Sequence, residues 1–191
     1  MNAIEQAVAA LRAGEVVALP TESSYGLAVD ARSEPALARL FALKAREAGK
    51  PPPLLVASEE MARTLAVRVP ERARALIDRF WPGPLTLVLP ARGGLPEAIV
   101  SQGGVGMRRS PHPIADGLVH AFGSPITATS CNLAGQPPAF TADEARAIFG
   151  GAVKILEGDA GRGAPSTVVR ISDDGALTVL RAGAIDPATL L

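Results

Sequence analysis

The sequence predicts an α/β fold in which helices flank a mixed, twisted β-sheet. Short apolar runs typical of buried strands intermix along the chain with segments of helical periodicity. Two late apolar runs flank Asp174-Gly175, a dipeptide typical of β-hairpins, so at least one strand pair is expected to be antiparallel. The chain has 191 residues, of which 48% are hydrophobic, and it shows no repeat and no linker. We therefore expect a single domain over 1–191.

In the first half of the chain, the spacing of apolar residues and the capping residues predict the helices and strands. A helix over 2–13 is expected to end at Gly14, and Ser33 is expected to cap a second helix. Lys44 and Arg46 fall at or just past the end of that helix, because the three prolines after Lys50 cannot continue it. The sequence also predicts strands over 16–19, 27–29 and 54–56 and a helix that begins at residue 58.

The second half continues the same pattern. Thr141 and Glu144 have the spacing of a capping box, which predicts a helix that ends near Gly150. The other expected helices cover 70–80 and 113–122, and the expected strands cover 85–89, 105–108, 126–129, 167–171 and 177–180.

Composition narrows the class of protein. Nineteen basic and nineteen acidic residues give a net charge of zero, which argues against a protein whose main task is binding nucleic acid. The N-terminus has no basic and apolar signal segment, and no apolar run approaches the ~20 residues that span a bilayer. One cysteine and two histidines make a zinc site improbable. We expect a cytoplasmic protein with no membrane attachment.

Polar residues that stand among apolar segments are the candidates for a functional site. Thr21 and Tyr25 belong to a hydroxyl-rich loop after a strand, which is either an ordinary turn or a ligand-binding loop. Lys44 and Arg46 form either a cationic helix end or an anion clamp. Ser130 and Asn132 follow an apolar strand, where they either satisfy local backbone groups or orient a sugar or an ammonium group.

Arginines at strand ends are further candidates. Either Arg108 or Arg109 is expected to point inward, and an inward arginine needs an anionic partner, which is a structural carboxylate or a substrate. Ser166 precedes one late strand and Arg181 ends the other. Cys131 is expected to be a small buried residue rather than a nucleophile.

Five of these segments together resemble the YrdC/Sua5 family of threonylcarbamoyl-AMP synthases in its short single-domain form. The family motifs are a P-T-E-T-x-Y-G-L loop, a K-x-R pair, a V-x-V-R strand, S-x-N and P-S-T-V-V. They correspond to residues 20–27, 44–46, 105–108, 130–132 and 165–169, with Ser23 in place of the motif threonine and Met107 in place of the second valine of V-x-V-R. Glu47 stands where the family has proline. The resemblance implies a twisted open sheet with a concave, positively charged cavity.

The resemblance also implies an activity. The family condenses L-threonine, bicarbonate and ATP into L-threonylcarbamoyladenylate and pyrophosphate, and other proteins then transfer the threonylcarbamoyl group to tRNA. It implies no tightly bound cofactor and no metal held by the protein, because Mg²⁺ arrives on the ATP phosphates. The residues implied for threonine are Thr21, Tyr25, Arg108, Ser130 and Ser166; those for ATP are Lys44, Arg46, Asn132 and Arg181, with Lys44 and Arg46 catalytic.

Two alternatives stay open at this point. A paralogue with the same fold could adenylate a different carbamate or acid, and the residues around Arg46 that depart from the motif keep this alternative in view. A module that binds RNA is the other, although the balanced charge leads us to expect any RNA contact to be weak.

Overall fold

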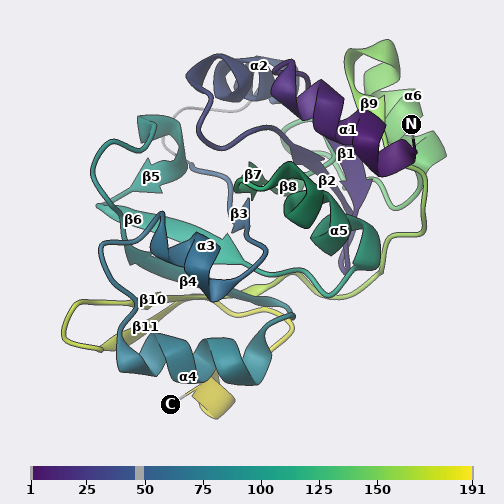
Figure 1. Cartoon of the computed structure of the whole chain (residues 1–191). Coiled ribbons are helices and arrows are strands. Elements are labelled where there is room, and N and C mark those ends of the chain that lie inside the picture. Colours follow the sequence, from purple (N-terminus) through teal and green to yellow (C-terminus); the bar gives the residue numbers. More distant parts are fainter. Residues whose placement is uncertain (1, 46–49, 191) are drawn as a thin grey trace.

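The computed structural model describes residues 2–45 and 50–190, so Arg46 and Glu47 lie outside the described residues. Figure 1 shows helices packed around two groups of strands, with α1 and α5 side by side near one group and α4 beside the other. The described α-helices are α1 (Ala3–Arg12), α2 (Glu34–Lys44), α3 (Glu59–Arg63), α4 (Glu71–Phe80), α5 (Pro113–Phe122) and α6 (Ala142–Phe149), with 3₁₀ turns at Glu97–Ile99, Gly150–Ala152 and Pro187–Leu190.

Helix starts occur where the capping residues predict them. The Ser33 side chain accepts a hydrogen bond from the Ala36 amide at the start of α2. Thr141 and Glu144 form the complete capping box of α6. Because such caps satisfy amide groups that have no partner within the helix, they fix where each helix begins.

The strands described within residues 2–45 and 50–190 form two mixed sheets. The first has the order β8-β2-β1-β9, with β1 antiparallel to β2 and parallel to β9. The second has the order β11-β10-β4-β6-β3-β7, with β5 paired to β6. The strands are β1 (Val17–Pro20), β2 (Tyr25–Ala28), β3 (Leu54–Leu55), β4 (Leu85–Pro90), β5 (Val100–Ser101), β6 (Gly104–Arg108), β7 (Ile126–Thr127), β8 (Thr129–Ser130), β9 (Lys154–Ile155), β10 (Thr167–Ile171) and β11 (Leu177–Arg181).

The predicted α/β class with a mixed sheet and flanking helices is confirmed. The predicted hairpin is also present, because β10 and β11 pair antiparallel around a turn in which Gly175 has a φ of +82°. The division of the strands into two sheets was not predicted.

The prediction of one strand over 126–129 is wrong. β7 pairs with β3 of the second sheet, whereas β8 pairs with β2 of the first. Between them the Ala128 amide donates to the Pro53 carbonyl at 2.8 Å, so the chain changes partners there. Each of residues 126–129 is buried, and an apolar run gives no sign of which sheet it joins. The crossing places Ser130 opposite Gly26, where the two sheets meet.

β1 is buried on both faces and so joins two parts of the core. Val17 and Leu19 belong to one buried cluster with residues of α1 and α5, among them Leu11 and Leu118. Val16 and Ala18 belong to the other cluster, which extends into the second sheet. A strand covered on both faces has apolar residues in sequence rather than in alternation.

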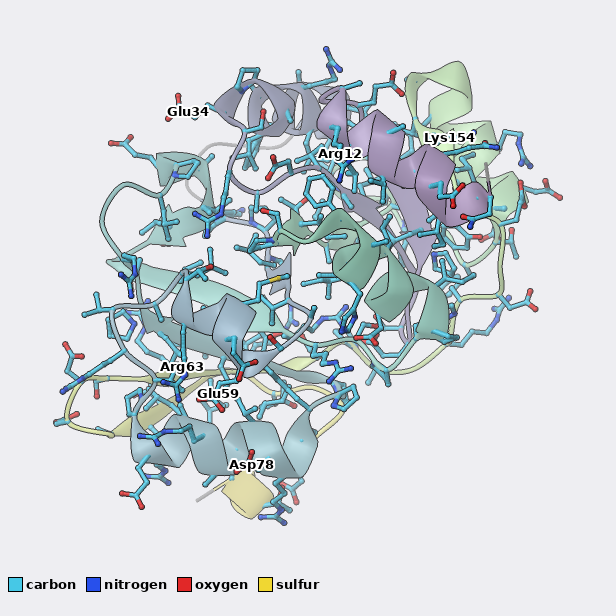
Figure 2. The ribbon with its side chains drawn as sticks, viewed as in Figure 1. Arg12, Glu34, Glu59, Arg63, Asp78 and Lys154 are labelled. Atoms are coloured by element: carbon cyan, nitrogen blue, oxygen red, sulfur yellow. The ribbon has the colours of Figure 1, made fainter. Side chains whose placement is uncertain are left out.

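Charged side chains such as Arg12, Glu34 and Asp78 lie on the outside of the molecule (Figure 2). None of the helices in the described part of the chain has both the length and the apolar character needed to cross a membrane.

Candidate active site

A cavity of about 470 Å³ lies between the polar loop of the first sheet and the strand ends of the second. Two of the predicted site residues are not among those that line it, namely Lys44 and Asn132, and Arg46 lies outside the described residues. The predicted residues that do line it are Thr21, Tyr25, Arg108, Ser130, Ser166 and Arg181. The structure thus gathers residues from distant parts of the chain into one cavity.

The loop between β1 and β2 is a structured turn. The Thr21 hydroxyl donates to the Ser24 carbonyl at 2.7 Å, and the Thr21 amide donates to the same oxygen at 3.0 Å. The Thr21 hydroxyl therefore has its proton engaged and can offer a ligand only lone pairs. Ser23 and Ser24 are less buried and also line the cavity, so this turn both shapes the wall and presents hydroxyl groups.

Tyr25 lines the cavity, but its hydroxyl group is bound elsewhere. The hydroxyl has the carbonyls of Leu156 and Gly158 within 3.0 and 2.8 Å. Burial, followed by the nearby Glu157 carboxylate, raises the pKa of Tyr25 to about 12. The phenol is therefore neutral, and it ties β2 to the segment that follows β9.

Arg108 is the inward arginine, and its partner is a carboxylate of the protein. Its Nη1 lies 2.5 Å from Oε1 of Glu22, and the two side chains are 6% and 16% exposed. The other Glu22 oxygen accepts a hydrogen bond from the Ser110 hydroxyl at 2.6 Å. Arg109 instead pairs with Asp116 near the surface. Glu22 is thus the structural carboxylate beside Arg108, and Arg108 also lines the cavity, so its predicted role toward a substrate stays a prediction.

Arg181 brings a second guanidinium into the same cavity. It donates to the Ser166 carbonyl at 2.7 Å and to the Ser166 hydroxyl at 3.1 Å. That hydroxyl also lies 2.8 Å from the Thr86 hydroxyl. Burial is the main cause that lowers the pKa of Arg181, and the like charge of the nearby Arg108 adds to it. An anionic ligand placed between them would relieve that repulsion.

Lys44 lies behind the cavity wall and not in it. Its ammonium group donates to the Ser130 carbonyl, and to the carbonyl and side-chain oxygen of Asn132 at 2.8 Å each. The Ser130 hydroxyl donates to the same Asn132 oxygen at 2.7 Å. The predicted contact of Lys44 and Asn132 with ATP stays a prediction. Lys44 holds the 130–132 segment against the end of α2.

Cys131 lies between these residues and is fully buried. Burial raises the pKa of its thiol to about 12 in spite of the nearby Lys44 charge. A thiol that stays protonated is a poor nucleophile, as the sequence predicted.

Arg162 and Phe140 are among the lining residues that the sequence reasoning missed. The Arg162 guanidinium lies 5.0 Å from the ring centre of Phe140, and both residues line the cavity. Gly161 sits so close to the polar loop that a Cβ on it would lie 2.0 Å from the Glu22 carbonyl oxygen. The signal was the sequence Gly161-Arg162-Gly163, which matches no phosphate-binding motif but permits this close approach.

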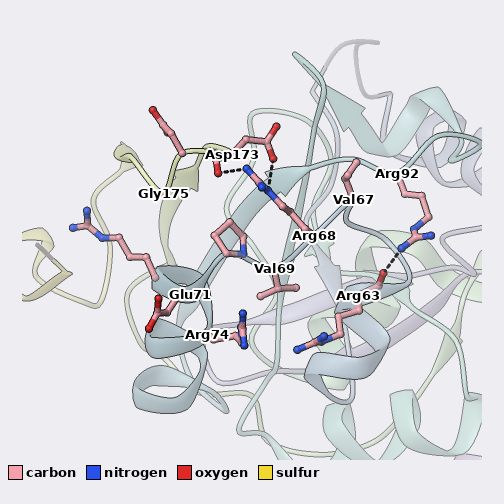
Figure 3. A pocket seen from close by; sticks show the side chains of 12 residues that line it. Arg63, Val67, Arg68, Val69, Glu71, Arg74, Arg92, Asp173 and Gly175 are labelled. Atoms are coloured by element: carbon pink, nitrogen blue, oxygen red, sulfur yellow. Dashed lines mark hydrogen bonds and ion pairs between the residues drawn. The ribbon is translucent and has the colours of Figure 1, made fainter.

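A larger hollow of about 880 Å³ lies elsewhere, around the start of α4 and the β10–β11 turn (Figure 3). Its lining includes Arg63, Arg68, Arg72, Arg74, Arg92, Glu71, Asp173 and Asp174. Arg68 pairs with Asp173 at 2.9 Å, and Arg63 pairs with Glu59 at 2.5 Å. None of the predicted site residues lines this hollow, so the smaller cavity is the candidate active site.

Comparisons with known proteins identify the family of the chain. A family model for Sua5, YciO and YrdC, described as "telomere recombination", matches residues 9–183. A threonylcarbamoyl-AMP synthase of Vibrio cholerae is 40% identical over 185 residues, which cover 94% of this chain and 97% of the relative. One from Pyrococcus abyssi is 40% identical over 168 residues, which cover 85% of this chain and 49% of the relative. The chain thus spans about half the length of that second relative.

A solved structure, that of P. abyssi Sua5 complexed with L-threonine, superposes with a TM-score of 0.91 at 36% identity. The superposition covers 98% of this chain and 56% of that one. The predicted resemblance is confirmed, and the chain belongs to the Sua5/YciO/YrdC family.

Proposed function

We propose that this chain is a threonylcarbamoyl-AMP synthase, which condenses L-threonine, bicarbonate and ATP into L-threonylcarbamoyladenylate and pyrophosphate. The observation that carries the proposal is the cavity, where Arg108 and Arg181 lie beside the hydroxyls of Ser130 and Ser166. Two cations and several hydroxyl groups suit a ligand with a carboxylate, a hydroxyl and phosphates. The names of the relatives support the same activity.

The reaction needs two bonds to form. The threonine amine and bicarbonate give a carbamate with loss of water. A carbamate oxygen then attacks the α-phosphorus of ATP, and the bond from that phosphorus to the bridging oxygen breaks as pyrophosphate leaves. No covalent intermediate with the protein is required, so positioning and charge neutralisation carry the catalysis.

The residues have distinct proposed roles. Arg108 and Arg181 bind the substrate carboxylate and phosphates, and Ser130 and Ser166 orient threonine. Thr21 and Tyr25 shape the threonine pocket, Tyr25 with its ring. Lys44, Arg46 and Asn132 are proposed ATP ligands, with Lys44 and Arg46 catalytic. Lys44 also holds Ser130 and Asn132 in place. We also propose that Mg²⁺ is carried by the ATP phosphates.

We further propose that residues 1–191 form one domain in the cytoplasm, and that separate proteins transfer the threonylcarbamoyl group to tRNA. The thiol of the buried Cys131 is compatible with a reducing compartment.

The test is pyrophosphate release from ATP in the presence of bicarbonate and Mg²⁺. We expect release to depend on L-threonine and to be much weaker with serine or other amino acids. Ser166→Ala should lower kcat/KM for threonine, whereas Ser124→Ala, at a residue that does not line the cavity, should not. Release with a different amine only would support the paralogue, and no release from a folded sample would contradict the proposed reaction.

A further inference from the structure

A hollow of about 400 Å³ adjoins the cavity and shares Pro53 and Arg181 with it. It opens over β4, β6, β10 and β11 and is bordered by the segment 50–53. Thr86 lines this hollow and contacts Ser166 of the cavity at 2.8 Å. A ligand in the cavity could therefore extend into the hollow past Arg181.

Arg170, on β10, is the least satisfied side chain in this hollow. Its Nε is buried and has no hydrogen-bond partner among the described residues. Its two terminal nitrogens reach the carbonyls of Gln102 and Ser101 only at 3.5 and 3.4 Å, which is long for such bonds. A partly buried guanidinium with long bonds of this kind has donors at its terminal nitrogens available for an anion.

The charge and the shape of the hollow also suit an anion. Lys50, Arg170 and Arg181 line it, and none of its described lining residues is acidic. Gly104 leaves room beside the guanidinium, because a Cβ there would lie 2.7 Å from Val88 Cγ1 and 3.5 Å from Arg170 Nη2. The hydroxyl of Thr86 adds a neutral hydrogen-bonding group.

We propose that this hollow is a phosphate-binding subsite in which Arg170 contacts the phosphate oxygens. The phosphate group comes either from the polyphosphate of ATP, including released pyrophosphate, or from a separate phosphate-bearing ligand. The assignment of the phosphate to ATP rests on the proposed synthase function. The existence of the subsite does not depend on that function.

The test is the binding of inorganic pyrophosphate to the purified chain by isothermal titration calorimetry. Loss of one charged contact in a partly exposed site should weaken binding about tenfold in Arg170→Gln. Arg170→Lys, which keeps the charge, should restore most of the affinity. Arg74→Gln, in the other hollow, is the matched control and should bind as the wild type does. Circular dichroism and Tm verify that each variant is folded.

Two results would overturn the proposal: Arg170→Gln that binds pyrophosphate as tightly as Arg74→Gln, or a wild-type chain that binds none. Where binding falls as expected, kinetics identify the source. A raised KM for ATP in Arg170→Gln assigns the subsite to the polyphosphate of ATP, and an unchanged KM assigns it to a separate ligand. If the wild type binds pyrophosphate through Arg170 but releases none from ATP with threonine, the subsite stands and the proposed function fails.

Discussion

The Arg108–Glu22 pair should be worth more to stability than any surface ion pair in this chain. Removing one partner of a buried pair costs about 3–5 kcal/mol, because the remaining charge is left without compensation. We expect about 3 kcal/mol for Arg108→Gln, the lower end of that range. The Glu22 side chain is 16% exposed and keeps its bond to Ser110 at 2.6 Å, and both features reduce the penalty.

Urea unfolding and thermal melting measure this cost. For a chain of this size, about 3 kcal/mol corresponds to a drop in Tm of roughly 6–12 °C. Arg109→Gln is the control, since it breaks the neighbouring pair with Asp116, whose side chains are 32% and 26% exposed. A pair with that much exposure should contribute only about 0–1 kcal/mol.

A double-mutant cycle separates the pair from its surroundings. Glu22→Gln leaves Arg108 close to Arg181 without its counter-charge, so this variant should also be destabilised. The double variant should be more stable than the sum of the single changes predicts, by about 2 kcal/mol. Equal costs for Arg108→Gln and Arg109→Gln, or a double variant that is simply additive, would refute the reasoning from burial.

Three further predictions concern residues in or near the cavity lining, namely Tyr25, Cys131 and Gly161. Tyr25→Phe should cost about 1–3 kcal/mol, because it leaves the buried Leu156 carbonyl and the partly buried Gly158 carbonyl without their donor. The pKa of Tyr25 is raised from 10.0 to about 12 in the folded state, so the contribution of its hydroxyl to folding stability is complete below pH 10 and is lost as the pH rises toward 12. Plots of stability against pH for the wild type and Tyr25→Phe should therefore converge near pH 12. Parallel plots would contradict this. Cys131 should resist iodoacetamide at pH 8 in the folded chain and react on unfolding, as mass spectrometry can show; rapid labelling of the native chain would disprove its burial. Gly161→Ala should lower Tm and weaken threonine binding, since its Cβ would meet the Glu22 carbonyl at 2.0 Å, whereas Gly151→Ala has open space and serves as control.

Local signals in the sequence were sufficient for most helices and strands. Ser33 and Thr141 mark helix starts because their hydroxyl groups satisfy amides three residues away, which is a property of the local sequence alone. The partner change at Ala128 could not be predicted in this way. Residues 126–129 are buried whichever sheet they join, and the choice depends on Pro53 and Gly26, which are remote in sequence.

In the candidate site, too, the sequence could not predict which groups the charged side chains contact. Alternation along a strand predicts that one of two adjacent arginines points inward, but it says nothing of the partner, which Glu22 provides from the loop after β1. Lys44 has the residue type and spacing of an anion clamp, yet its ammonium group is directed at oxygens of Ser130 and Asn132. A lysine that binds carbonyl oxygens fixes the backbone of a loop, whereas one that binds phosphate follows its ligand. In this structure the cations that face the cavity are arginines, and the lysine sets the position of the serine opposite them.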